Sequence, residues 1–270
     1  MKLKKIAHLS EIYKSYDTFI IDLWGVMHDG IALHNDAEIA VRNLIDKNKR
    51  VVFLSNAPRP NSDVVKFLKS LNMSDRYLKN IMTSGQAAIT ALKSDKFGKS
   101  FFHVGPERDS SIYNGFKNKK TTIEKCDFIL CTGLFDEHET ELEYYKKLFK
   151  KYTNKKLICT NPDLTVHRGN VVEICAGAVA KVFFEIGGQV VYFGKPHEEI
   201  YKLILKRDEK NLVIGDNLNT DIKGANNLKL DSLFVTNGVH RHEFKEDEEL
   251  DNLLDSYKVK ANYFQKNMCW

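Results

Sequence analysis

The sequence alternates short, largely apolar runs with longer segments of helical periodicity along most of its 270 residues. The candidate strands are Phe19–Leu23, Val51–Leu54, Phe101–Val104, Phe128–Cys131, Leu157–Cys159, Val190–Phe193, Leu212–Ile214 and Ser232–Val235. The candidate helices between them are Ala37–Lys47, Ser62–Leu71, Glu141–Lys151, Ala178–Ile186, Glu198–Lys206 and Ile222–Leu228. Apolar strands that alternate with helices are typical of a parallel sheet covered by helices on both faces. The sequence therefore predicts an α/β fold with right-handed crossover connections.

Charge and composition exclude several classes of protein. Lys and Arg exceed Asp and Glu by only 41 − 36 = 5, and the basic residues are spread along the chain. We therefore expect no groove for nucleic acid. No run approaches the roughly 18 apolar residues of a membrane span, and no secretory signal is recognisable. The five cysteines form no Cys-x-x-Cys pair, which predicts buried thiols in a reducing compartment, and we expect a cytoplasmic protein without a membrane partner.

Polar residues follow four of the predicted strands at the point where each strand ends. In chain order they are Asp22, Ser55 with Asn56, Lys195, and Asp216 with Asp221. Each has an ordinary explanation when taken alone, because such residues are common in turns and loops. The carboxyl ends of parallel strands, however, line the ligand crevice of such a sheet. The combination therefore predicts one site for an anion and a hard cation.

The predicted anion is a phosphoryl group. Asp22 can attack phosphorus and thereby divide one difficult displacement into two easier ones. Lys195 can hold the transferring group by its charge, while Ser55 and Asn56 can donate hydrogen bonds to the phosphate oxygens.

The predicted cation is Mg²⁺, which takes oxygen ligands and offsets the repulsion between a carboxylate and a phosphate. Asp22 and Asp216 are the candidate ligands. Asp221 begins a predicted helix, so it can either accept a hydrogen bond from a metal-bound water or cap that helix.

Four motifs make the sequence similar to a known family. They are Asp22-Leu23-Trp24-Gly25-Val26 after a strand, Leu54-Ser55-Asn56, Gly194-Lys195-Pro196, and Gly215-Asp216-Asn217-Leu218-Asn219-Thr220-Asp221. In this order they resemble the motifs of the haloacid dehalogenase-like (HAD) hydrolase superfamily, over about residues 16–239. Two further segments, Thr160-Asn161-Pro162-Asp163 and Ala176-Gly177-Ala178, resemble its class IIA branch of NagD-like phosphatases and 4-nitrophenylphosphatases.

The resemblance implies a Mg²⁺-dependent phosphatase of small phosphorylated metabolites, such as sugar or nucleotide phosphates. Its phosphoenzyme would form on Asp22, with Lys195 as the other catalytic residue. The metal would be bound by Asp22, Asp216 and the main-chain oxygen of Trp24, with Asp221 behind them.

The resemblance also implies two domains: a Rossmann-like catalytic core at 1–82 and 190–270, and an inserted α/β cap of the C2 type at 83–189. The spacing agrees, because Ser55 follows Asp22 by 55 − 22 = 33 positions, whereas Lys195 follows Ser55 by 195 − 55 = 140. Only the second gap can hold a folded insert. Asn161, Asp163 and Arg168 would be the cap residues that approach the substrate. Members of this branch also pair through their caps, which implies a homodimer.

One position departs from the family pattern. Phosphatases of this superfamily carry an aspartate two positions after the nucleophile, where it protonates the leaving group, but this chain has Trp24. A positioned general acid contributes about 10²–10⁴-fold to a rate. We therefore expect weakened turnover, retained best on aryl and acyl phosphates, whose leaving groups need no proton. Alternatively, His28 or Asp29 supplies the proton, and Trp24 stacks on the substrate, blocks the pocket or packs under the cap.

Two other functions are weighed against a phosphatase. A catalytically impaired protein that binds phosphorylated metabolites would retain the same site. A 2-haloacid dehalogenase also carries an aromatic residue two positions after its nucleophile, but it does not need the pair Asp216 and Asp221. Its cap lies in the first gap, which is too short here.

Overall fold

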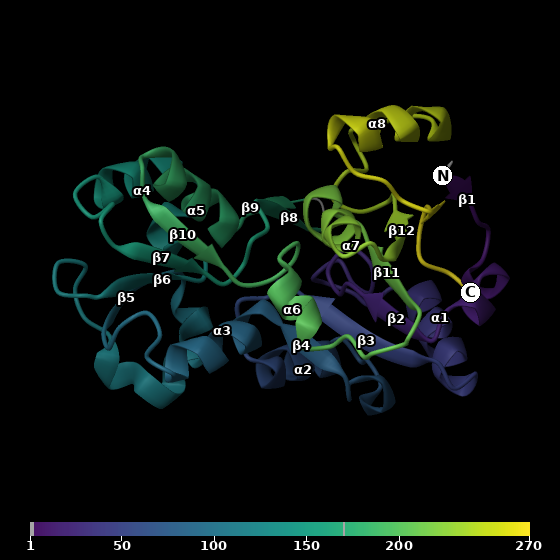
Figure 1. Ribbon diagram of the computed structural model, residues 1–270, viewed down its shortest axis with the longest axis horizontal. Coiled ribbons are helices and arrows are strands. Elements are labelled where there is room, and N and C mark those ends of the chain that lie inside the picture. Colours follow the sequence, from purple (N-terminus) through teal and green to yellow (C-terminus); the bar gives the residue numbers. More distant parts are fainter. Residues whose placement is uncertain (1–2, 170) are drawn as a thin grey trace.

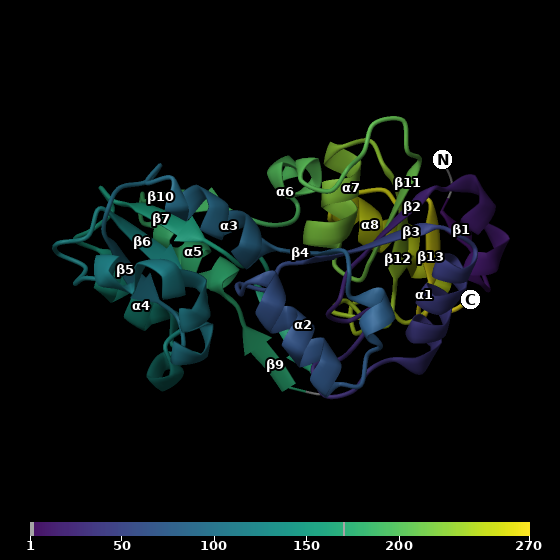
Figure 2. The ribbon, with the colours of Figure 1, turned by 90° about the horizontal axis from the view of Figure 1, so that it is seen from below.

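The computed structural model describes residues 3–169 and 171–270. It has two lobes, and each is built on a parallel sheet (Figures 1 and 2). We define the large lobe as residues 3–83 and 193–270, and the small lobe as the described residues of 84–192. The confirmed fold class is therefore α/β, as the alternation of runs and helices predicts.

The large lobe contains a seven-stranded sheet with all neighbours parallel. In spatial order its strands are β1 (Lys4–Lys5), β13 (Tyr263–Gln265), β12 (Asp231–Val235), β11 (Asn211–Gly215), β2 (Thr18–Ile21), β3 (Arg50–Ser55) and β4 (Ile81–Thr83). Its helices are α1 (Asn35–Asp46), α2 (Asn61–Ser70), α6 (Glu198–Lys202), α7 (Lys223–Asn227) and α8 (Leu250–Ser256). Strands β2 and β11, which carry two of the predicted site segments, are direct neighbours.

The small lobe contains a four-stranded parallel sheet in the order β10 (Gln189–Tyr192), β7 (Lys156–Cys159), β6 (Phe128–Cys131) and β5 (Phe101–Val104). Its helices are α3 (Ser84–Lys93), α4 (Leu142–Phe149), α5 (Ala176–Glu185) and a 3-10 segment, Glu107–Lys119. An antiparallel hairpin of β8 (Thr165–Arg168) and β9 (Val171–Ile174) projects between the lobes (Figures 1 and 2). The predicted boundary at 189/190 falls inside β10, so this sheet ends 192 − 189 = 3 residues later than predicted.

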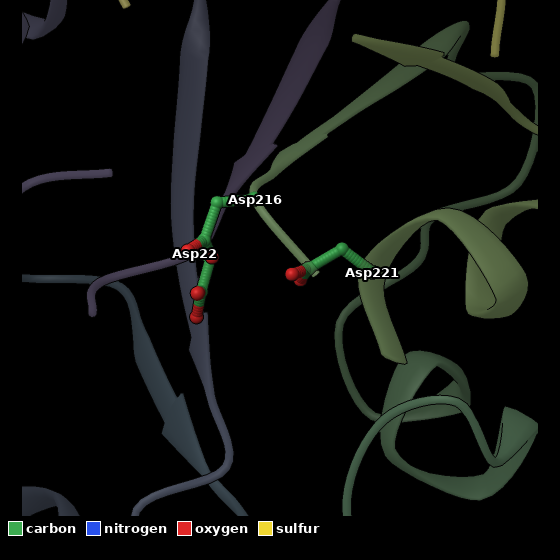
Figure 3. A group of neighbouring side chains, drawn as sticks. All are labelled: Asp22, Asp216 and Asp221. Carbon is green, nitrogen blue, oxygen red and sulfur yellow. The ribbon is translucent and has the colours of Figure 1, made fainter. Parts of the chain in front are cut away.

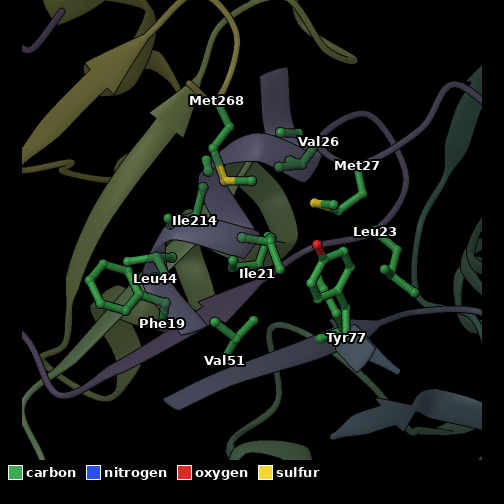
Figure 4. Close-up of a cluster of buried hydrophobic side chains, with 14 of the residues drawn as sticks. Phe19, Ile21, Leu23, Val26, Met27, Leu44, Val51, Tyr77, Ile214 and Met268 are labelled. Atoms are coloured by element: carbon green, nitrogen blue, oxygen red, sulfur yellow. The ribbon is translucent and has the colours of Figure 1, made fainter. Parts of the chain in front are cut away.

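The central strands are buried on both faces, which explains why they are apolar without alternation. On one face of β2, Phe19 and Ile21 pack in a cluster with Leu44 of α1 (Figure 4). Ile20, between them in sequence, packs on the opposite face with Tyr201 of α6. The rigid, fully covered sheet therefore holds the residues that follow its strands in fixed positions.

Four cysteines, Cys126, Cys131, Cys159 and Cys175, are buried and unbridged, as predicted, and Cys269 is partly exposed. Among the described residues, no helix has both the length and the apolarity that crossing a membrane requires.

Candidate active site

Three carboxyl groups meet at the carboxyl end of the large sheet. Asp22 follows β2, and its N–H still donates to the Ile214 carbonyl of the neighbouring strand at 2.9 Å. Asp216 follows β11, and Asp221 lies in a π-helical turn, Leu218–Ile222, from which its carboxyl group points toward the other two (Figure 3). One oxygen of each lies within 4.8 Å of the others. The adjacency of β2 and β11 thus brings together residues that are almost 200 positions apart.

Lys195 enters this cluster from the segment that returns from the small lobe after β10. Its Nζ lies 2.6 Å from Asp22 Oδ1 and 2.7 Å from Asp221 Oδ1, and the residue is only 2% exposed. Burial opposes the charge of this ammonium group, but the carboxylates of Asp22 and Asp221 overcome that effect and raise the pKa of Lys195. The lysine therefore stays protonated beside the candidate nucleophile.

Burial and mutual repulsion disfavour the ionised forms of the carboxyl groups. Burial raises the pKa of Asp22 well above its ordinary value, although Lys195 opposes the shift. Burial, reinforced by the Asp221 carboxylate, raises the pKa of Asp216 to about 7. When all three are ionised, three negative charges face one positive charge, which leaves −3 + 1 = −2 in a buried site. A divalent cation with oxygen ligands would offset this excess.

The individual carboxylates differ in their freedom to bind a cation. Asp221 is already engaged, because Oδ1 accepts from Lys195 and Oδ2 accepts from the Asn217 N–H at 3.2 Å. Asp216 is held by the Val239 N–H at 2.8 Å, and it packs so closely against Gly238 that a Cβ there would lie 2.0 Å from Oδ2. The donor set thus fits a hard cation held chiefly by Asp22 and Asp216.

Asn56 follows β3, as predicted, and lies against Lys195. Its Oδ1 accepts from the Lys195 N–H at 2.8 Å, and its Nδ2 lies 3.2 Å from both the Lys195 carbonyl and Asp163 Oδ1. The Asn56 amide therefore positions Lys195, and the binding of phosphate by Asn56 stays a prediction. Ser55 is buried beside it with Oγ accepting from the Ala57 N–H at 3.2 Å, so its hydroxyl proton is still available to a phosphate.

All three predicted cap residues line the cavity, in different ways. Asp163 Oδ1 accepts from Asn56 and, at 3.4 Å, from Asn217, so it joins the lobes directly behind Lys195. Burial raises the pKa of Asp163 to about 6. Asn161 lines the cavity, but its Oδ1 accepts from the Asp163 N–H at 3.1 Å and so holds the turn. Arg168 is paired with Glu173 at 3.2 Å.

Trp24 spans the gap between the lobes. Its Nε1–H donates to the His167 carbonyl of β8 at 2.7 Å, and the Arg168 guanidinium lies 5.9 Å from its ring centre. The expectation that Trp24 packs under the inserted lobe therefore agrees with its position. Sequence reasoning missed Arg241 of the large lobe, because no motif marks this residue. Its guanidinium donates to the Gly169 carbonyl at 3.3 Å.

Neither alternative proton donor is in a suitable state. His28 is 2% exposed, with Nδ1 accepting from the Gly30 N–H at 3.1 Å. Burial lowers the pKa of His28 to about 4, so the imidazole is neutral at physiological pH. Asp29 accepts the N–H groups of Ile31 and Ala32 in a turn; these hydrogen bonds outweigh burial and lower its pKa. The structure thus argues against both as general acids.

The carboxylates open into a cavity of about 760 Å³ lined by both lobes. Its walls include the Trp24 indole, the β8–β9 hairpin and residues of the Glu107–Lys119 segment. This volume exceeds that of a phosphate ion and lies within the range of small-molecule sites.

This chain is similar to hydrolases among family profiles, curated proteins and solved structures. Residues 19–117 match the profile of the haloacid dehalogenase-like hydrolases, and residues 192–258 match a second HAD-hydrolase-like profile. The 5'-nucleotidase YutF of Bacillus subtilis is 25% identical over 87% of this chain and 93% of its own. The ribonucleotide monophosphatase NagD of Escherichia coli is 26% identical, over 82% and 87%. A haloacid dehalogenase-like hydrolase of Brucella suis, whose crystal structure is known, is 30% identical with a TM-score of 0.85, over 97% and 98%.

Proposed function

This chain belongs to the haloacid dehalogenase-like hydrolases, in their class IIA branch, and we propose that it is a Mg²⁺-dependent phosphatase of small phosphorylated metabolites. The observation that carries the proposal is the buried Lys195 ammonium between Asp22 and Asp221, with Asp216 completing the acidic cluster. Relatives named as a 5'-nucleotidase and an acid sugar phosphatase favour nucleotide or sugar phosphates as substrates.

The proposed reaction uses the chain's own residues at each step. Asp22 attacks phosphorus through a carboxylate oxygen, so that an aspartyl-phosphate bond forms while the bond to the leaving oxygen breaks. Lys195 holds Asp22 in place and faces the incoming phosphoryl charge, and Ser55 donates to a phosphate oxygen. Water then attacks phosphorus of the aspartyl-phosphate, which releases inorganic phosphate and a proton to solvent and regenerates the Asp22 carboxylate. When bound by Asp22 and Asp216, Mg²⁺ would supply charge neutralisation.

Trp24 narrows the range of leaving groups in this proposal. Its only polar hydrogen is engaged with the His167 carbonyl, and an indole N–H is no acid at neutral pH. Neutral His28 does not replace the missing acid. Leaving groups that depart as stable anions, such as nitrophenolate or acetate, would therefore react best. We also assign the small lobe as a C2-type cap that covers the site.

A catalytically impaired protein that binds phosphorylated metabolites is the second candidate, and the absence of an acid at Trp24 favours it. It would hold a phosphate between Lys195 and Ser55 without turnover. A dehalogenase is less consistent with the site, because carbon attack has no use for the acidic cluster of Asp22, Asp216 and Asp221.

A substrate panel distinguishes the first two functions. Hydrolysis of 4-nitrophenyl phosphate, acetyl phosphate and glycerol phosphate would be measured with Mg²⁺, for the native protein and for Asp22→Asn. The exposed Asp208→Asn provides a matched control. We expect turnover on the first two compounds, lost in Asp22→Asn alone. Phosphate binding without hydrolysis of any compound would instead favour the binding protein, and full activity of Asp22→Asn would exclude the covalent mechanism.

A further inference from the structure

Three hydrogen bonds among the described residues attach the β8–β9 hairpin to the large lobe. The Trp24 indole N–H donates to the His167 carbonyl at 2.7 Å. At the turn, the Gly169 N–H donates to the Asp29 carbonyl at 3.1 Å, and the Gly169 carbonyl accepts from Arg241 at 3.3 Å. The hairpin is part of the small lobe by sequence, so these bonds cross from one lobe to the other.

Besides these hydrogen bonds, the hairpin contacts the large lobe through Arg168 over the Trp24 ring and His167 beside His242. It consists of two four-residue strands that pair only with each other. Val171 and Val172 of β9 are 63% and 55% exposed, so this strand is poorly covered by apolar packing. An isolated two-stranded hairpin is at best marginally stable in water. Its position over the cavity therefore depends strongly on each bond to the large lobe.

Trp24 is well suited to this task because its ring is fixed on several sides. Gly30, with φ of +87°, lies so close that a Cβ would come within 2.6 Å of the indole Cζ2 and 3.4 Å of Arg168 Cγ. The His28 ring contacts the indole edge-on at 5.2 Å between centroids. A ring held in this way directs its single N–H at one acceptor, the His167 carbonyl.

The attachment point lies next to the reacting groups. Trp24 is two residues after Asp22, and both line the same cavity as His167 and Arg168. A change in the hairpin at this point would alter the cavity wall that faces the candidate nucleophile. The Trp24 bond thus connects the loop that carries Asp22 directly to the opposite wall.

We propose that Trp24 is the positioning residue that docks the β8–β9 hairpin over Asp22, with Arg241 as its partner, so that substrate binding depends on an intact Trp24–His167 hydrogen bond. The consequence for substrate rests on the proposed function, but the docking itself does not. The two can therefore be tested separately.

The docking test uses fluorescence and needs no turnover. The chain has two tryptophans, Trp24 and Trp270, and the ring of Trp270 packs against Tyr13. In a Trp270→Phe protein, Trp24 alone reports the contact. Adding Arg241→Met removes one of the three bonds without changing Trp24, and should shift the equilibrium toward the released hairpin by about threefold to tenfold. Acrylamide quenching of Trp24 should rise, whereas the exposed Arg207→Met control should leave it unchanged.

Hydrogen exchange tests the Trp24 bond itself. Trp24→Phe keeps an aromatic ring but removes the donor, and amides of 165–169 and 171–174 should exchange about threefold to tenfold faster, with β3 unaffected. Unchanged exchange in the hairpin, or unchanged quenching in Arg241→Met, would overturn the proposal. If Trp24→Phe unfolds the protein, β3 will also exchange faster, and the Arg241→Met quenching result then decides.

Kinetics add the link to substrate. With 4-nitrophenyl phosphate, Trp24→Phe should raise KM about threefold to tenfold while kcat changes by less than about twofold, because binding is affected more than chemistry. An equal loss in kcat and no change in KM would contradict substrate positioning by the docked hairpin. Absence of turnover in the native protein would count against the phosphatase proposal alone, since quenching and exchange still report docking.

Discussion

The Arg59 guanidinium lies 2.7 Å from the Asp109 carboxylate and joins the loop after β3 to the small lobe. Asp109 is 3% exposed, and burial raises its pKa even though Arg59 opposes the shift. Both residues line the active-site cavity. Like the hydrogen bonds of Asp163, this ion pair therefore connects the lobes independently of the hairpin.

Removing the Arg59 charge should weaken the attachment of the small lobe. In Arg59→Met, the buried Asp109 carboxylate loses its partner, and we expect the free energy of unfolding to fall by about 1–3 kcal/mol. Urea unfolding at pH 7 would measure it. Arg207→Met, at a 96% exposed side chain, should change stability by less than about 0.5 kcal/mol. Equal effects of both substitutions would show that the ion pair contributes nothing.

Replacing Trp24 with aspartate should restore a general acid near the leaving group. We expect kcat/KM for glycerol phosphate to rise about tenfold or more. 4-Nitrophenyl phosphate should show no gain, because its leaving group needs no proton and the bond to His167 is lost. Trp24→Asn is the matched control. Asparagine is similar in size to aspartate, and this variant also loses the bond to His167, but it cannot deliver a proton. Identical kinetics of the two variants would mean that the missing acid does not limit the reaction.

Asp163 should make stability decrease as pH rises. Its pKa is about 6 in the folded protein against an ordinary 3.8, so the folded state retains a proton that the unfolded state releases between about pH 4 and 6. Above that window, the ionisation of Asp163 lowers the free energy of unfolding by roughly 3 kcal/mol. Asp163→Asn should remove this decrease while keeping an acceptor for Asn56. The difference in unfolding free energy between variant and native protein should therefore grow in favour of the variant from pH 4 to 6.5; a constant difference would contradict this.

Mg²⁺ should stabilise the protein through the carboxylates of Asp22 and Asp216. After removal of metal with EDTA, saturating Mg²⁺ should raise Tm by about 5 °C, because a ligand at about 100 times its Kd adds about 2.7 kcal/mol. Asp216→Asn should lose most of the shift, and Asp208→Asn should keep it. A shift of the same size in Asp216→Asn would place the cation elsewhere.

Much of the fold was readable because it rests on local patterns. The eight predicted apolar runs correspond to β2, β3, β5, β6, β7, β10, β11 and β12, since fully buried parallel strands carry unbroken apolar stretches. The short strands β1, β4 and β13 and the β8–β9 hairpin were not predicted. Strands of two or three residues and a half-exposed hairpin lack a continuous apolar signal, so nothing in their composition sets them apart from loops.

Sequence patterns were enough to identify the polar groups that follow strands, and the adjacency of β2 and β11 brings Asp22 and Asp216 together. Lys195 follows a strand of the other sheet, so its arrival at the site depends on how the chain returns from the small lobe. The sequence could not determine which partner each group would take. Asn56 binds Lys195 and Asp163, and Trp24 meets His167 across 167 − 24 = 143 positions. Such contacts depend on how two lobes pack, because a hydrogen bond needs a partner within about 3 Å in the right direction. Only the tertiary structure sets that distance.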